Sequence, residues 1–376
     1  MTVSLVFFAL LQGVDSAAFV TRLGTDTVAI ERWVRTAERL DSEYVLRVPV
    51  TRYARYSVTL DERGNATSWS TSIWSGADTT RVPELRERAV LRGDTLVVER
   101  VRGVQSQTLR VPADSLILPF IDMIHWPYEL ALLRFARSGR KDLAQPLLTG
   151  SQRSVFTLVR SEPNSVAITH PTRGTMTARV ASDGRIEILD AGGTTRALVV
   201  ERRGWLDVFP YAIEYAARDA AGRSMGELSG RGSGEFEVGG VKVTLDYGTP
   251  LKRGRDIWGA LVPWGRVWRT GANRATHITI DGDLKFGELL VPAGTYTLYT
   301  IPEPEGGLLI VNRQTGQNGQ VYNSDRDLGR IPMRRAALAE PVEAFTIRVE
   351  NRGDGVALRL MWDRSEFYVP VSPVGR

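Results

Sequence analysis

Few side chains in this sequence could carry out nucleophilic, acid–base or metal chemistry. The 376 residues include no Cys and only three His, at His125, His170 and His277. Without cysteine the chain can form neither thiolate metal sites nor a disulfide framework. No two of the histidines have the spacing of a metal-ligand pair. We therefore expect neither a bound metal nor a cofactor.

One serine lies in a string that is typical of hydrolases. Gly222, Ser224 and Gly226 match G-x-S-x-G, whose serine is normally exposed on a tight turn from a strand into a helix. Here a predicted helix comes before the string and Gly- and Ser-rich residues come after it, and only His277 lies downstream as a base. Because short motifs often match by accident, we expect no catalytic residue and keep a hydrolase as an alternative.

Tryptophan and arginine gather in the C-terminal third and give the best candidate for a binding surface. Cation–π pairs between such side chains contribute about 0.5 to 2 kcal/mol each. The cluster could form an aromatic platform for a sugar or a protein partner, or it could be a packed corner of a barrel, because large aromatic side chains usually fill cores. The candidate surface comprises Trp258, Trp264, Arg266, Trp268, Arg269, Asn273, His277 and Tyr296.

The elements before residue 222 are predicted to be strands with two helices. Apolar Tyr56, Val58 and Leu60 alternate with polar residues, which is typical of a strand with one wet face. Proline near the start and glycine just after the end predict helices at 128–137 and 206–221. We predict a mainly β protein with two antiparallel sandwich- or barrel-like domains, the first carrying two short helices.

The predicted boundary between the domains is a segment rich in Gly and Ser. Residues 223–235 contain little that could pack, so they are interpreted as a flexible linker. The first domain then spans residues 19–222 and the second spans 236–376. Short apolar segments separated by turns after residue 236 favour a second sandwich or barrel.

Several short sequence motifs in the second domain occur in a specific order. They include residues 243–250, residues 261–273 and the run from Ala293 to Tyr296. Over about residues 236–371 the chain resembles the DUF2911 family of uncharacterised bacterial proteins. The resemblance implies a compact exported β-domain, often attached to other modules, and the family has no established activity to carry over. Two departures are Arg274, where the family often has Glu, and Asn318-Gly319, where it often has Trp-Gly.

The first 18 residues have the pattern of a secretory leader or an apolar anchor. An apolar run over residues 3–14 is followed by the small residues Ser16 and Ala18, which suit a signal peptidase. The run is shorter than the roughly 20 residues that cross a bilayer, and no further candidate span follows. A cysteine-free chain also suits an oxidising compartment. We expect a periplasmic or otherwise exported protein, peripheral to a membrane.

The charge composition separates two classes of partner. The formal net charge is +5, but only four of the 48 Lys+Arg residues are lysine, and no basic run of five or more occurs. A nucleic-acid partner is therefore not indicated. Arg and Trp are enriched at protein interface hot spots. We predict a non-enzymatic interaction protein that docks on a membrane-associated complex of the cell envelope, for example as an extrinsic subunit of an electron-transfer or photosynthetic assembly. A carbohydrate or small-molecule binding module is the alternative.

Overall fold

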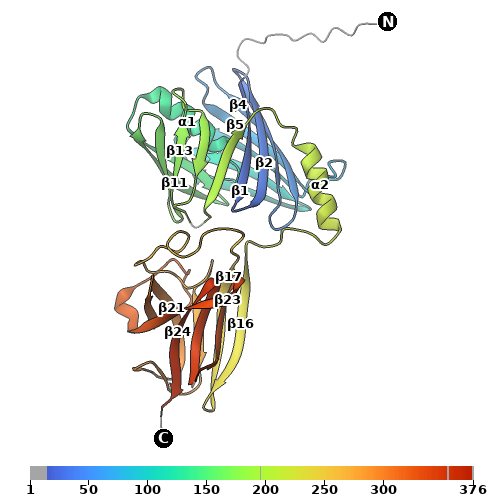
Figure 1. Cartoon of the computed structure of the whole chain (residues 1–376). Helices are drawn as coiled ribbons and strands as arrows, with labels where there is room; N and C mark the ends of the chain where they lie inside the picture. Colours follow the sequence, from blue (N-terminus) through green and yellow to red (C-terminus); the bar gives the residue numbers. More distant parts are fainter. Residues whose placement is uncertain (1–14, 195, 354, 375–376) are drawn as a thin grey trace. The chain divides into compact units, whose positions relative to one another are not determined.

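The computed structural model describes residues 15–194, 196–353 and 355–374. The chain divides into two compact units, Met1–Gly226 and Glu227–Arg376 (Figure 1). Each unit is built around an antiparallel sheet, and both helices belong to the first. The predicted fold class is confirmed.

The N-terminal unit has a 15-stranded sheet in which β2 to β8 follow β1 on one side in chain order, and β15 to β9 follow it on the other side in reverse order. Strand β1 pairs with β2 on one side and with β15 on the other, and among the described strands of this unit the short β9 is the one that pairs in parallel, with β10. The strands are β1 (Asp15–Leu23), β2 (Asp26–Arg35), β3 (Arg39–Leu46), β4 (Arg52–Leu60), β5 (Ala66–Ser75), β6 (Leu85–Arg92), β7 (Thr95–Arg102), β8 (Gln105–Pro112), β9 (Leu118–Pro119), β10 (Asp142–Thr149), β11 (Gln152–Glu162), β12 (Ser165–His170), β13 (Gly174–Val180), β14 (Ile186–Asp190) and β15 (Leu198–Arg203).

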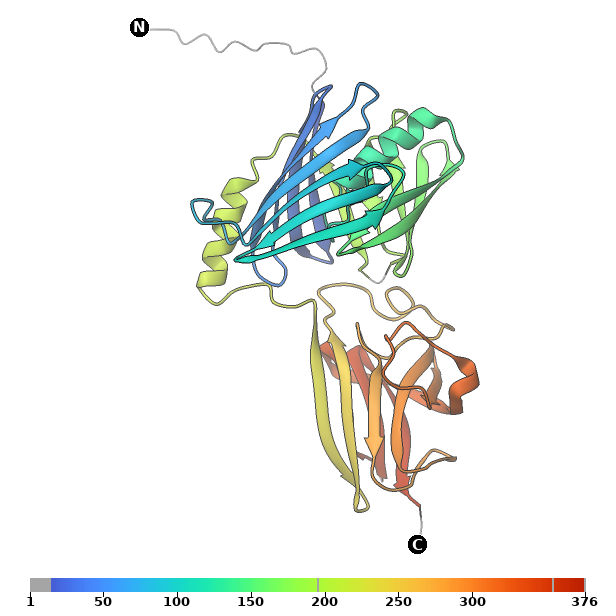
Figure 2. The ribbon, with the colours of Figure 1, turned by 180° about the vertical axis from the view of Figure 1, so that it is seen from behind.

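Helix α1 (Trp126–Ser138) contacts strands from both arms of this sheet. The Trp126 ring lies 5.4 Å from that of Tyr56 on β4, and the Tyr128 ring lies 5.7 Å from that of Phe156 on β11. The sheet therefore curves around α1, which is buried along most of its length (Figure 2). The helix ends at Gly139, whose φ of 65° is the left-handed conformation that glycine favours.

Helix α2 (Phe209–Ala220) packs against the other face of the same sheet. Ala212 and Tyr215 contact a cluster that includes Ile30 of β2. The neighbouring Glu31 binds the start of α1 instead, because successive side chains of a strand point to opposite faces.

The predicted domain start at residue 19 is wrong, because β1 begins at Asp15. Ala17 and Ala18 are buried, and Ala18 is paired with both Arg32 and Arg203. Their small side chains suit a signal peptidase and the crowded middle of a sheet equally well. The rest of the predicted leader, residues 1–14, lies outside the described residues.

The C-terminal unit has a nine-stranded sheet that folds over one apolar core. A hydrogen bond across the core shows that the sheet folds over on itself. The Tyr247 hydroxyl on β17 accepts the Ile347 N–H of β23 at 2.9 Å, although these two strands are not neighbours in the sheet. The elements are β16 (Ser229–Val238), β17 (Val241–Pro250), β18 (Thr276–Ile280), β19 (Leu284–Phe286), β20 (Leu289–Val291), β21 (Gly294–Glu303), β22 (Gly306–Asn312), the 3-10 turn η1 (Ser324–Arg326), β23 (Asp327–Arg352) and β24 (Gly355–Pro373).

Most of the predicted linker is a strand, which corrects the interpretation of residues 229–235. They form the first part of β16 and pair with β17 from Ser229↔Pro250 onward. A Cβ on Gly232 would lie 2.5 Å from the Tyr247 ring, and one on Gly234 would lie 2.5 Å from the Phe236 ring. These glycines allow aromatic rings to cover the strand, a use of glycine that composition alone does not distinguish from flexibility.

Candidate functional site

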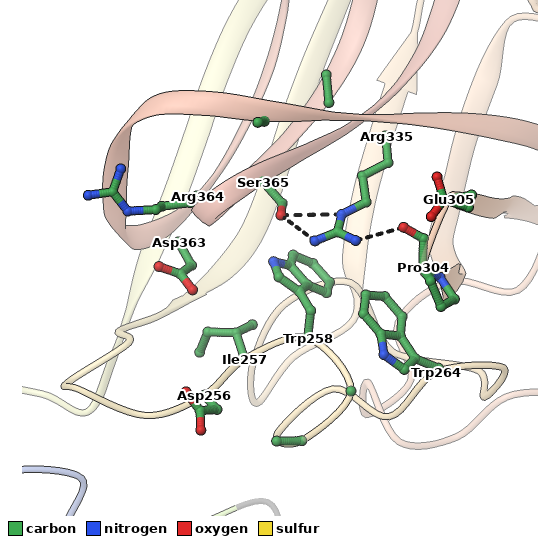
Figure 3. A pocket seen from close by; sticks show the side chains of 14 residues that line it. Asp256, Ile257, Trp258, Trp264, Pro304, Glu305, Arg335, Asp363, Arg364 and Ser365 are labelled. Atoms are coloured by element: carbon green, nitrogen blue, oxygen red, sulfur yellow. Dashed lines mark hydrogen bonds between the residues drawn. The ribbon is translucent and has the colours of Figure 1, made fainter.

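The C-terminal unit contains a pocket of about 760 Å³ at one end of its sheet (Figure 3). The loop after β17 supplies its aromatic wall, the β21–β22 turn supplies a second wall, and β23 and β24 supply the polar wall. The lining residues are Asp256, Ile257, Trp258, Gly259, Ala260, Trp264, Pro304, Glu305, Arg335, Ala336, Ala337, Asp363, Arg364 and Ser365.

Two tryptophan rings form the aromatic wall. Trp258 and Trp264 are both half-buried, and their rings are nearly parallel, with centroids 6.3 Å apart. Trp258 is held from behind, because its Nε1 donates to the Trp362 carbonyl at 3.2 Å. Gly259 lets Trp264 approach: its φ is +85°, and a Cβ there would lie 2.4 Å from Trp264 Nε1. The loop therefore presents two preorganised rings to the pocket.

Arg335 of β23 provides the main cationic group. Its Nη2 donates to Ser365 Oγ at 2.9 Å and its Nη1 donates to the Pro304 carbonyl at 2.6 Å. The guanidinium carbon lies 5.3 Å from the centre of the Trp264 ring, a cation–π geometry. Among the described residues no carboxylate lies within ion-pair distance of Arg335, so its charge is not neutralised there.

An irregular stretch of the β23–β24 pairing shapes the polar wall. The register shifts on both sides of the Val342↔Asp363 pair, and Asp363 has a φ of +54°. Lys252 Nζ fixes the Asp363 carboxylate at 2.5 Å. Bulges and positive-φ residues occur frequently beside binding sites, because they aim side chains that regular strands would point elsewhere.

The predicted binding surface is only partly at this pocket. Trp258 and Trp264 line it. Trp268 packs with the core instead, its ring 5.0 Å from Phe345 and 6.0 Å from Trp362. Tyr296 is buried and donates its hydroxyl proton to the Pro292 carbonyl at 2.9 Å, so its ring is core and not a stacking surface.

The two arginines that were expected beside the tryptophans do not line the pocket. Arg266 is exposed, and Arg269 Nε donates to the Gly271 carbonyl at 3.3 Å. Arg335, about 70 positions further along the chain, takes the cation–π role at Trp264.

Neither Asn273 nor His277 lines the pocket, and His277 belongs to a separate charged cluster. The Asp246 carboxylate accepts two bonds from Arg231, at 2.8 and 2.9 Å, and one from Arg274 at 3.3 Å. The bonds from Arg231 lower the pKa of Asp246. His277 is opposite Asp246 in the sheet, and burial lowers its pKa although that carboxylate opposes the shift. Asn273 is exposed nearby in sequence, with a φ of +62°.

Sequence reasoning missed the polar residues of the pocket, Arg335, Ser365 and Asp363. They lie on two long strands about 70 to 110 positions after the tryptophans. The only local signal was Asp363-Arg364-Ser365-Glu366, four polar residues that interrupt an apolar strand after Trp362. Such an interruption is typical of a bulge.

The described residues contain neither a metal-binding cluster nor a membrane-spanning helix. In residues 15–374, apart from 195 and 354, no three His, Asp or Glu side chains converge closely enough to hold a metal ion. Among the helices that the structure describes, none has both the length and the apolarity to cross a membrane.

The fold and pocket define a class of antiparallel β protein with a preorganised surface pocket in its C-terminal unit. Residues 229–371 match the family described as "Protein of unknown function (DUF2911)", which confirms the resemblance seen in the sequence. No curated protein matches the chain. A similar solved structure is the beta-barrel-like protein of domain of unknown function DUF1849 from Brucella abortus, at 15% identity over 52% of this chain and 99% of that chain, with a TM-score of 0.34.

Proposed function

We propose that this protein is a non-enzymatic, exported binding protein whose C-terminal unit holds a carbohydrate in the Trp258–Trp264 pocket. The observation that carries the proposal is the pair of half-buried, nearly parallel rings beside Arg335, which has no carboxylate partner among the residues that the structure describes. Aromatic faces suit the apolar faces of sugar rings, and a few convergent polar groups fix orientation in such pockets. Arg335, Asp363 and Glu305 can supply these polar contacts.

Binding is favoured over hydrolysis by the surroundings of the pocket serine. Ser365 Oγ accepts bonds from Arg335 Nε and Nη2, at 3.3 and 2.9 Å. An arginine is always protonated and cannot take the proton of a hydroxyl, so it does not activate a nucleophile. Ser224 of the G-x-S-x-G string is exposed just beyond α2, away from a strand-to-helix turn.

Export is proposed from the sequence. The apolar run over residues 3–14 and the lack of cysteine both suit an oxidising compartment.

The binding proposal is tested with the full chain and four trisaccharides: cellotriose, maltotriose, chitotriose and trigalacturonate. We expect titration calorimetry to detect one of them, and Trp264→Ala to weaken its binding at least tenfold, which corresponds to about 1.4 kcal/mol. Trp205→Ala is the matched control, since Trp205 is exposed in the other unit. No binding by any of the four, or equal affinity for the two variants, would refute the proposal.

A docking role on a cell-envelope complex is the second candidate, and Trp205 favours it. This ring lies in the segment between β15 and α2, is 63% exposed, and has the Arg32 guanidinium 4.3 Å from its centre. Exposed Trp and Arg are frequent hot-spot residues. The proposed partner is a membrane-associated protein complex, for example one of electron transfer or photosynthesis. Recovery of one complex from native membranes by the wild type and by Trp264→Ala, but not by Trp205→Ala, would support it, and equal recovery by Trp205→Ala would contradict it.

A further inference from the structure

The N-terminal unit contains a cavity of about 550 Å³ beside α1. Leucines from separate segments line it: Leu91 is on β6, Leu116 precedes β9, Leu118 begins β9 and Leu130 is on α1. A cavity of this size falls in the range of small-molecule sites. Asn65, Thr67 and Ser115 line it as well, so the leucines form one side of the cavity, and that side suits an apolar chain.

The polar end of the cavity is a partly buried arginine. Arg134 on α1 donates from Nη2 to Gln145 Oε1 at 2.5 Å, and Gln145 is itself buried. Within the described ranges no carboxylate forms an ion pair with Arg134. Elsewhere in this unit buried carboxylates do pair with arginines, for example Glu129 with Arg202 at 2.7 Å. Arg134 is therefore a partly buried cation that has no carboxylate partner in the described part of the chain.

The groups that face Arg134 increase the local positive charge. Arg137, one turn further along α1, lies against the 61–65 turn, with its Nη1 3.3 Å from the Cβ position of Gly64. Both burial and Arg137 lower the pKa of Arg134. Asp61 is the one acid in the lining, and its Oδ1 accepts the backbone N–H groups of Arg63 and Asn65 at 2.9 and 2.7 Å. The Asp61 carboxylate is therefore already hydrogen-bonded within its own turn.

We propose that this cavity binds a fatty acid, with the carboxylate on Arg134 and the alkyl chain along the leucines. A guanidinium presents two parallel N–H donors that match a carboxylate, and pairing removes the cost of an unneutralised buried cation. Each methylene that the leucines bury should raise affinity by up to about fourfold. This inference is independent of the carbohydrate pocket, which lies in the other unit.

The test compares headgroups and chain lengths on the full wild-type chain by titration calorimetry, below the micelle concentration of each probe. We expect dodecanoate to bind one per chain, octanoate to bind about a hundredfold more weakly, and dodecyltrimethylammonium to bind at least tenfold more weakly than dodecanoate. Binding of dodecyl phosphate without binding of dodecanoate would assign a different headgroup and overturn the proposal. Equal affinity for the anionic and cationic chains would also overturn it.

Variants test the role of Arg134 itself. Arg134→Met should weaken dodecanoate binding at least tenfold, and Arg134→Lys, which keeps the charge, should restore part of it. The control is Arg140→Met, because Arg140 pairs with exposed Asp142 at 3.8 Å outside the cavity. Far-UV circular dichroism shows whether each variant folds, and the headgroup comparison needs no variant. Equal affinity of Arg134→Met and Arg140→Met would contradict the proposal.

Discussion

Replacing Glu31 by Gln should destabilise the start of α1, although Glu31 lies on β2, far from α1 in the sequence. The buried Glu31 carboxylate of β2 accepts the His125 N–H at 2.6 Å and the Trp126 N–H at 3.1 Å. The helix has no side-chain cap of its own at His125. Glu31 therefore provides both hydrogen-bond acceptors and negative charge at the N-terminus of α1, where the helix dipole favours an anion.

The magnitude follows from these two contacts. A hydrogen bond to a charged group contributes about 1.5 to 3 kcal/mol, and a charge at a partly buried helix end adds up to about 2 kcal/mol. A glutamine keeps one acceptor oxygen but turns an NH2 group toward the second N–H. We therefore expect Glu31→Gln to lower the free energy of unfolding of this unit by about 2 to 4 kcal/mol.

The assay has to separate the two units. Hydrogen exchange at the amides of residues 126–138 reports on α1 alone, and guanidinium denaturation followed by circular dichroism reports on the whole chain. The control is Glu214→Gln, which removes an exposed ion pair with Arg218 on α2 and should cost less than about 0.5 kcal/mol. If Glu31→Gln exchanges as slowly as the control, the cap is not stabilising and the reasoning is wrong.

Two further predictions concern a buried acid and a strand glycine. Burial raises the pKa of Glu129 from 4.5 to about 7. The folded state therefore binds this proton more tightly than the unfolded state does. The stability that protonated Glu129 contributes should be lost as pH rises from 4.5 to 7, by about 3 kcal/mol. Glu129→Gln should flatten this dependence in denaturation curves, and parallel pH profiles for both proteins would contradict the assignment. Gly232→Ala should cost about 1 to 3 kcal/mol because its Cβ would meet the Tyr247 ring at 2.5 Å. Gly355→Ala, where a Cβ meets nothing within 4 Å, is the control for thermal unfolding, and equal losses would refute the steric account.

Local patterns in the sequence were sufficient for the fold class. Tyr56, Val58 and Leu60 are buried in β4 as their alternation predicts, because burial of one face of a strand depends only on a period of two. Helix α1 was predicted from Pro127 and Gly139, which act on the backbone within one turn of their own positions. These effects need no knowledge of distant residues.

The same local reasoning misread two segments. Ala18 is in the middle of a sheet only because β15, some 180 positions away, returns to pair with β1. The glycines of β16 form a strand because the Tyr247 and Phe236 rings cover them. A Gly-rich composition does not show which rings pack against the segment. In both cases the partner that determines the structure lies outside the segment.

The sequence by itself determined the alternating strands, the two helices, the family resemblance of the C-terminal part and the tryptophans available for binding. Only the tertiary structure decided which tryptophans face a pocket, that Arg335 meets Trp264, and that Glu31 caps α1. The physical reason is that hydrogen bonds, ring contacts and ion pairs act over a few ångströms in space. Sheet register and curvature, set by the whole chain, determine which distant residues come within that range.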